Sequence, residues 1–255
     1  MNGYIAFSKK EWLEAWRSYR LPLMLAVFLI FGMMNPLTAK LMPVLVDNFM
    51  PAGIVVNLPE PTALDSWAQF YKNVPQLGLL FTAVLFSGML SGEYARGTLV
   101  IPLSHGLSRR AILWAKLSVS AALWAASFVL CFTVSWAYTA YFWDGDQLQH
   151  LLFAAGCLWL FGLLLIVCLL LGGCLFRSTY GCLLFTGGFV GLQFLMGIFP
   201  QVNKYLPLRL ASENLALIQE ETPLSDLLAP LGVTAILLVG GIGCAHFLFA
   251  RKNIA

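Results

Sequence analysis

Charged residues are scarce in this sequence. They make up 11% of its 255 residues, whereas an ordinary soluble domain carries roughly 25%. Hydrophobic residues make up 60%, and the mean hydropathy is +0.81. This composition excludes a soluble globular domain and predicts a polytopic membrane protein.

The motifs of an intramembrane enzyme are also missing. The sequence has no HExxH, its three histidines (His105, His150 and His246) are scattered, and no Asp or Glu falls inside a predicted span. No lysine follows a glycine, so the chain has no Walker A motif. We therefore expect no catalytic residue, metal or cofactor in this chain, and any ATP-driven motor must be a separate polypeptide.

Other classes find little support. The six cysteines lack a CxxC spacing, and we interpret them as packing residues. The net charge of +3 is spread over separate segments, which argues against a nucleic-acid surface. An ion-coupled carrier usually has ionisable residues in mid-membrane, and the last five spans have none near their middles. Sodium sites built from carbonyls and hydroxyls stay open.

The long apolar stretches predict six transmembrane helices, each of roughly 20 residues or more. They lie near 21–42, 75–92, 110–142, 151–176, 181–200 and 228–250. With both termini in the cytoplasm, eleven of the fifteen Lys and Arg residues fall inside: Lys9, Lys10, Arg17, Arg20, Arg96, Arg109, Arg110, Lys116, Arg177, Arg251 and Lys252. We therefore expect one all-α domain over 1–255 with this topology.

Residues 7–20 predict an amphipathic helix on the cytoplasmic leaflet. Ser8 and Glu11 would form its capping box, and Trp12, Trp16 and Tyr19 share one face that would contact membrane lipid. Pro22 favours an elbow before the first span.

Three further segments carry local expectations. Lys116, near the start of the third span, would snorkel to the cytoplasm. Trp67, Phe70 and Tyr71 would lie at the outer interface, at the end of an extracellular loop over 43–74. Residues 200–227 fit either short helices dipping into the outer leaflet or a helical loop on its surface.

The short polar segment 93–108 has the features of a docking element. Gly97 can end a helix, Pro102 bends the chain, and Ser108 can N-cap the third span. Glu93 and Arg96 offer charges to a partner. The apolar residues Leu99, Val100, Ile101 and Leu103 offer an anchor.

Here the sequence resembles the permease subunits of type-2 ATP-binding-cassette exporters, in a short bacterial form. The resemblance rests on Glu93-x-x-x-Gly97-Thr98-Leu99, Pro102-Leu103-Ser104, Ser108-Arg109 and Lys116. It implies that 93–108 forms a coupling helix seated in an ATPase subunit, which would bind the ATP and magnesium. Glu93, Arg96, Gly97, Thr98, Leu99 and Pro102 are then the candidate coupling residues. The resemblance also implies a second permease copy, identical or different, in the cytoplasmic membrane, and a re-entrant region before the last span.

The resemblance thus predicts an exporter. The apolar, uncharged character of the spans favours a hydrophobic or amphipathic cargo, such as an antimicrobial peptide, a drug or a lipid. A sodium exporter of the same family is one alternative. An ATP-independent immunity or scaffold protein is another, and an ion-coupled carrier is a third. If 93–108 couples to a motor, Gly97→Pro or Glu93→Arg should uncouple transport from ATP hydrolysis while the spans stay folded.

Overall fold

The computed structural model describes residues 2–49, 60–104, 106–143, 148–176 and 178–251, and this part of the chain is helical with no strand. Within these described residues, six stretches are long and apolar enough to cross a membrane, which confirms the predicted number of spans and the all-α class. They are α2 (Arg20–Phe49), the series α3 (Ala63–Asn73), η1 (Val74–Gly78), α4 (Leu79–Phe86) and α5 (Gly88–Arg96), then α7 (Arg109–Phe142), α8 (Leu151–Leu175), α9 (Thr179–Met196) and α13 (Leu224–Arg251).

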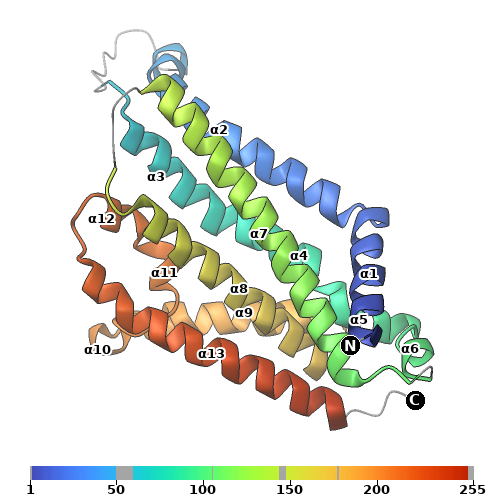
Figure 1. The fold of residues 1–255 in the computed structure, drawn as a ribbon. Helices are drawn as coiled ribbons and strands as arrows, with labels where there is room; N and C mark the ends of the chain where they lie inside the picture. Colours follow the sequence, from blue (N-terminus) through green and yellow to red (C-terminus); the bar gives the residue numbers. More distant parts are fainter. Residues whose placement is uncertain (1, 50–59, 105, 144–147, 177, 252–255) are drawn as a thin grey trace.

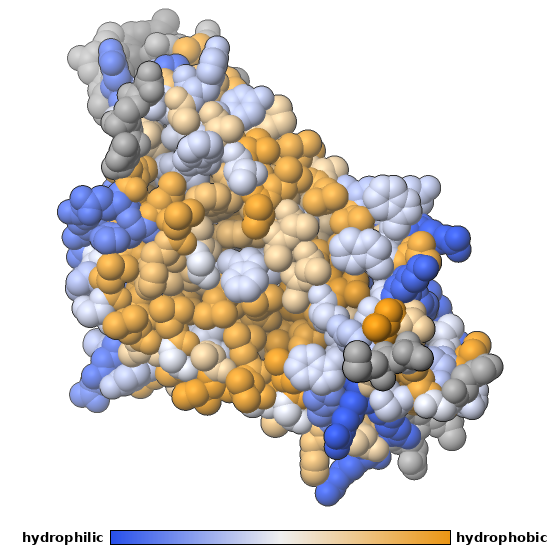
Figure 2. Space-filling view, in the orientation of Figure 1, coloured by the Kyte–Doolittle hydropathy of each residue, from blue (hydrophilic) through white to orange (hydrophobic). Residues whose placement is uncertain are grey.

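Helix α8 forms the centre of the bundle (Figure 1). It packs against α7, α9 and α13, and 72% of its most apolar window is buried, against 17% for α9 and α13. On the other side of α7, α2 and α3 pack together and against α7. Much of the outer surface is apolar (Figure 2), as expected where lipid takes the place of water.

The first helix, α1 (Asn2–Arg17), meets α2 at an elbow, as predicted. The break falls at Ser18 and Tyr19, where Tyr19 has a left-handed φ of 59°, and Pro22 lies in the first turn of α2. Trp12, Trp16 and Tyr19 are exposed, so the predicted aromatic face is present.

The predicted capping box is wrong. Because α1 begins at Asn2, Ser8 lies inside the helix instead of before it. Glu11 is free for another role, and it is buried on the face of α1 that packs against α7.

Both described ends of the chain lie at one end of the bundle (Figure 1). Arg109, at the start of α7, donates hydrogen bonds to the carbonyls of Phe249 and Ala250 in the last turn of α13. A basic side chain commonly satisfies such terminal carbonyls. This end, which also carries α1, is called the coupling end below. The positive-inside pattern predicts that it faces the cytoplasm.

At the opposite end, the second span starts earlier than expected. Trp67, Phe70 and Tyr71 are buried on α3 instead of facing the outer interface. Phe70 meets the rings of Phe128 and Phe132 on α7, and the Ser66 and Thr139 hydroxyls lie 2.6 Å apart. The expectation of a loop was wrong because α3 prolongs the span and its aromatic face packs on α7. Residues 50–59 of that loop lie outside the described part.

Residues 200–227 contain the short helices α10 (Pro200–Asn203), α11 (Arg209–Ser212) and α12 (Asn214–Ile218), followed by the start of α13. Helices α11 and α12 pack on α8 and bury Leu210, Leu217 and Ile218. The segment is therefore part of the core packing. A re-entrant position in the membrane stays a prediction.

Candidate functional site: the coupling end

The segment predicted to dock a partner begins with a helix stop. Gly97 ends α5 in a left-handed conformation, with φ 66°, and its N–H donates to the carbonyl of Tyr94. The N–H of Thr98 donates to the carbonyl of Glu93. Glycine adopts this conformation at little cost, which explains the residue at this position.

Beyond Gly97 the chain forms α6 (Val100–Ser104), with Pro102 inside it, and then enters α7. The hydroxyl of Ser108 accepts a hydrogen bond from the N–H of Ala111, which confirms the predicted N-cap. Together α5, α6 and the start of α7 form a hairpin at the tip of the coupling end (Figure 1).

The apolar residues of this hairpin divide into two groups. Leu99 is buried at 1% exposure and holds the hairpin to the bundle. Val100 and Ile101 are 49% and 62% exposed, and Arg96 is also exposed. Gly97, Thr98 and Ser104 are exposed as well. Among the exposed residues, Arg96 offers a charge and Val100 and Ile101 offer apolar area, and we call these three the docking patch.

Glu93 is placed differently from the sequence-based expectation. The resemblance assigns it to the partner interface, but its side chain points into the bundle and is only 3% exposed. Its two carboxylate oxygens lie 2.7 Å from Nζ of Lys10 and 2.9 Å from Nζ of Lys116. In this structure Glu93 therefore connects helices and offers no charge at the surface.

Glu93 belongs to a larger ion-pair cluster, formed by Lys10, Glu11, Glu14, Glu93, Arg96 and Lys116. Lys116, on α7, is 2% exposed and lies 3.1 Å from both carboxylate oxygens of Glu11. The prediction that Lys116 snorkels is wrong, because α1 covers α7 at this level and brings the counter-ion to it.

The charges of the cluster balance, with three acidic and three basic side chains. Three carboxylate oxygens, from Glu11, Glu14 and Glu93, lie within 4.8 Å of one another, a spacing that could hold a metal ion. However, Nζ of Lys10 lies within 3.0 Å of all three residues. Because Lys10, Lys116 and Arg96 together already neutralise the three carboxylates, the arrangement is an ion-pair cluster by its chemistry.

Two members of the cluster that are not fully buried, Lys10 and Glu14, have shifted pKa values. Burial by itself lowers the pKa of Lys10, but hydrogen bonds to Glu14 and Glu93 and the nearby negative charges raise it well above its ordinary value. Burial by itself raises the pKa of Glu14, but the hydrogen bond and charge of Lys10 hold it below its ordinary value. Both side chains therefore stay ionised at neutral pH.

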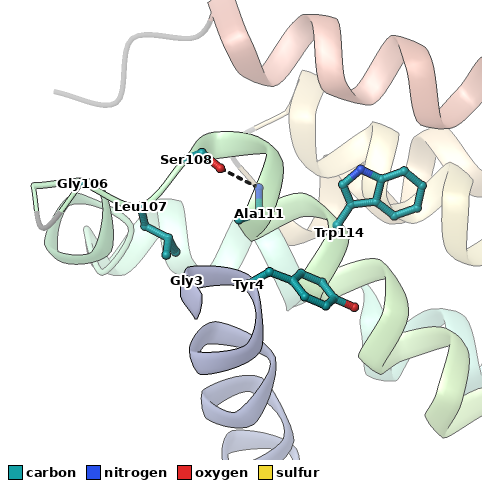
Figure 3. A pocket seen from close by; sticks show the side chains of 7 residues that line it. All are labelled: Gly3, Tyr4, Gly106, Leu107, Ser108, Ala111 and Trp114. Atoms are coloured by element: carbon teal, nitrogen blue, oxygen red, sulfur yellow. Dashed lines mark hydrogen bonds between the residues drawn. The ribbon is translucent and has the colours of Figure 1, made fainter. Parts of the chain in front are cut away.

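A hollow of about 580 Å³ lies beside the hairpin (Figure 3). Its walls come from the first turn of α1, the loop before α7 and the first turns of α7, and they include Tyr4, Ser108 and Trp114. Leu107 packs so closely over Gly3 that a Cβ there would lie 2.7 Å from Cδ1 of Leu107. This contact joins the N-terminal turn of α1 to the docking hairpin.

The cluster was not predicted from the sequence. Lys10 was placed only among the cytoplasmic basic residues, and Lys116 was expected only to snorkel. The usable signals were the i,i+4 spacing of Lys10 and Glu14 and the position of Lys116 inside an apolar span. Glu11 and Lys116 are 105 residues apart, and no local sequence pattern indicates that they are in contact.

The fold and this end define an all-helical, six-span membrane protein with an amphipathic first helix and an exposed helical hairpin. The family model described as "ABC-2 family transporter protein" matches residues 5–238, so the chain belongs to the ABC-2 transporter family. It is similar to "Uncharacterized transmembrane protein YxlG" of Bacillus subtilis (strain 168), with 20% identity over 216 residues and 84% of each chain covered.

Family membership identifies this chain as a membrane transport subunit. It is a multi-pass protein of the cell membrane. The family also implies an ATPase partner. These conclusions agree with the resemblance found in the sequence around residues 93–116.

Proposed function

We propose that this chain is the permease subunit of an ABC exporter that moves a hydrophobic or amphipathic cargo outward. A separate ATPase subunit binds ATP and magnesium, and the transporter is a complex of two permease copies and two ATPase subunits. Family membership and the absence of a Walker A motif support this assignment.

The ion-pair cluster is the observation that carries the proposal. It joins three helices: α1 through Lys10 and Glu11, α5 through Glu93, and α7 through Lys116. The docking patch begins at Arg96, three residues after Glu93. A displacement of the hairpin by the ATPase is therefore passed to α7, which crosses the membrane, and to α1, which leads through the elbow into α2.

In this mechanism the work of the docking site is divided between two sets of residues. Val100 and Ile101 provide apolar contact area for the ATPase, and Arg96 provides a charge at its rim. Glu93 acts behind them as a positioning residue, because it holds α5 to α1 and α7. Gly97 provides the turn that presents α6.

The docking patch is tested by Ile101→Asp, with Tyr180→Asp as the matched control. Both residues are exposed, and Tyr180 lies at the start of α9, outside the hairpin. Affinity purification of the wild-type chain in mild detergent should recover a stoichiometric Walker A protein. Ile101→Asp should lose it because a carboxylate replaces the apolar contact, and Tyr180→Asp should retain it.

Recovery of the wild-type chain alone, or as a dimer without any ATPase in several mild detergents, would contradict the proposal and favour a scaffold or carrier. Equal recovery of the ATPase with Ile101→Asp would move the docking surface away from α6.

Transmission is tested separately at Gly97 and Glu93. Glu93→Arg would place a third cation beside Lys10 and Lys116 and so disturb the fold as well. Glu93→Gln is the cleaner change. Gly97→Ala forces a side chain into a left-handed conformation, at a cost of roughly 1–2 kcal/mol. Both variants should still bind the ATPase. ATP should no longer change the distance between spin labels at Met34 in the two permeases, and an unchanged response would remove the transmission role.

A further inference from the structure

A second pocket lies away from the coupling end, and no residue of the coupling site lines it. It is about 660 Å³ in volume, within the range of roughly 300–1,000 Å³ typical of ligand sites. Its walls come from α3, η1 and α4 on one side, α8 and α9 on another, and the short helices α11 and α12. The pocket is therefore formed between three spans and the segment that covers their ends.

One wall runs along the second span. Lys72, Gln76, Leu79 and Ala83 follow one another on the same helical face and all line the pocket. At a rise of 1.5 Å per residue, the distance from Lys72 to Ala83 is roughly 16 Å. The hydrocarbon core is about 30 Å thick, so the pocket is as deep as one leaflet.

The depth of Lys72 follows from its neighbour. The hydroxyl of Tyr71 donates to the carbonyl of Leu151, the first residue of α8, so this turn of α3 lies level with the end of the bundle. Helix α12 contacts α3 at the same end. Lys72 therefore lies at the mouth of the pocket, and Leu165 and Leu183 line its walls between the spans.

The polarity of the pocket changes along its depth. Lys72 is the sole charged residue among those that line it, it is exposed, and it forms no ion pair within the described part of the chain. Most of the remaining walls are apolar. An unpaired cation above an apolar groove complements a molecule with an anionic head and an apolar tail.

We propose that this pocket binds one anionic lipid from the leaflet next to α11 and α12. Its head group pairs with Lys72, and one acyl chain extends along α4 and α9 between the spans. The leaflet-deep groove favours a lipid over a compact solute, because a chain that enters it keeps contact with apolar walls over its whole length. The proposal concerns binding by this chain itself and does not depend on the coupling mechanism above.

Two substitutions separate the parts of the site. Lys72→Glu reverses the charge at the mouth, and Lys204→Glu is its control because Lys204 does not line the pocket. Gly187→Phe fills the pocket, because no atom lies within 4 Å of the position of a Cβ there. Gly188→Phe is the matched control on the same helix, where space is also open but the pocket is not reached.

The measurement is native mass spectrometry of the purified chain in detergent. Phosphatidylglycerol and phosphatidylcholine with identical acyl chains are titrated separately. The wild-type chain should bind phosphatidylglycerol about fivefold more tightly, as expected for roughly 1 kcal/mol from one partly exposed charge pair. Lys72→Glu should abolish this preference, Gly187→Phe should lower the binding of both lipids, and the two controls should behave as the wild type.

Equal affinity of the wild-type chain for the two lipids would overturn the proposal. So would Gly187→Phe with unchanged binding, since the lipid would then be annular only. If Lys72→Glu does not yield a monodisperse protein, Lys72→Gln serves instead and should reduce the preference. Lys72 and Gly187 lie outside the docking patch, so failure of the lipid titration would leave the transport proposal intact, and loss of ATPase binding would leave this one intact.

Discussion

Lys116→Met would remove a cation from the centre of the ion-pair cluster while keeping most of the volume of the side chain. Lys116 is 2% exposed, and its ammonium group lies within 3.1 Å of carboxylate oxygens of both Glu11 and Glu93. After the substitution, Lys10 still lies close to both carboxylates, but the buried cation between them is gone. Breaking a buried ion pair by removing one partner costs about 3–5 kcal/mol, and we expect a loss of free energy of unfolding in that range.

The matched comparison is Arg96→Met in the same cluster. Arg96 is exposed, and its guanidinium lies 3.8 Å from Glu14, so its pair should contribute only about 0–1 kcal/mol. A double variant, Lys116→Met with Glu93→Gln, should recover part of the loss because one uncompensated carboxylate disappears.

Equilibrium unfolding in mixed micelles, followed by helical circular dichroism, measures all three variants. The reasoning would be refuted if Lys116→Met proved no more destabilising than Arg96→Met. It would also be refuted if Glu93→Gln deepened the loss instead of relieving it, because uncompensated charge would then not be the cause.

Three further predictions follow from individual contacts. Gly162→Ala should lower the free energy of unfolding by about 1–3 kcal/mol, because its Cβ would collide with the Trp124 indole. Gly156→Ala, in open space on the same helix, should leave it nearly unchanged, and unfolding in mixed micelles measures both variants. The fold lowers the pKa of Glu14 below its ordinary 4.5, so the ionised side chain stabilises the protein at pH values above about 4.5. The stability difference between wild type and Glu14→Gln should therefore shrink as the pH falls below about 4.5, and a difference independent of pH would contradict this. Replacing Trp12 and Trp16 with Ala should weaken contact of α1 with the bilayer, measured as faster cleavage near Lys9 by trypsin in nanodiscs, and unchanged cleavage would argue against an interfacial helix.

Several features of the fold could be predicted because their causes are local. The six spans follow from apolar stretches long enough for the bilayer. The N-cap at Ser108 and the helix stop at Gly97 follow from residue types that suit those backbone positions. The elbow before α2 was also expected, although the break at Tyr19 lies three residues before Pro22.

The candidate site was predicted in position but not in its internal arrangement. The segment 93–108 belongs to an exposed hairpin. The family model that matches residues 5–238 is the family that this segment resembles. However, Glu93 and Leu99 point inward, so that the docking patch is Arg96, Val100 and Ile101. Glu93 points inward because its counter-ions, Lys10 of α1 and Lys116 of α7, come from distant parts of the chain.

The aromatic residues of α3 illustrate the same limit. Trp, Phe and Tyr near a membrane edge suit an interfacial belt and a packed core equally well by composition. Phe70 is core because Phe128 and Phe132 of α7 lie opposite it, more than 50 residues away in the sequence.

The sequence by itself determined the solvent, the number of spans, the ends of several helices and the transporter family, because hydropathy, capping chemistry and local motifs depend on neighbouring residues. Only the tertiary structure decided which charges are buried together and which residues of the hairpin are exposed. Lys116 and Glu11 come from helices that are distant in the chain, and their burial is stable because each supplies a counter-ion to the other, with Glu93 and Lys10 beside them.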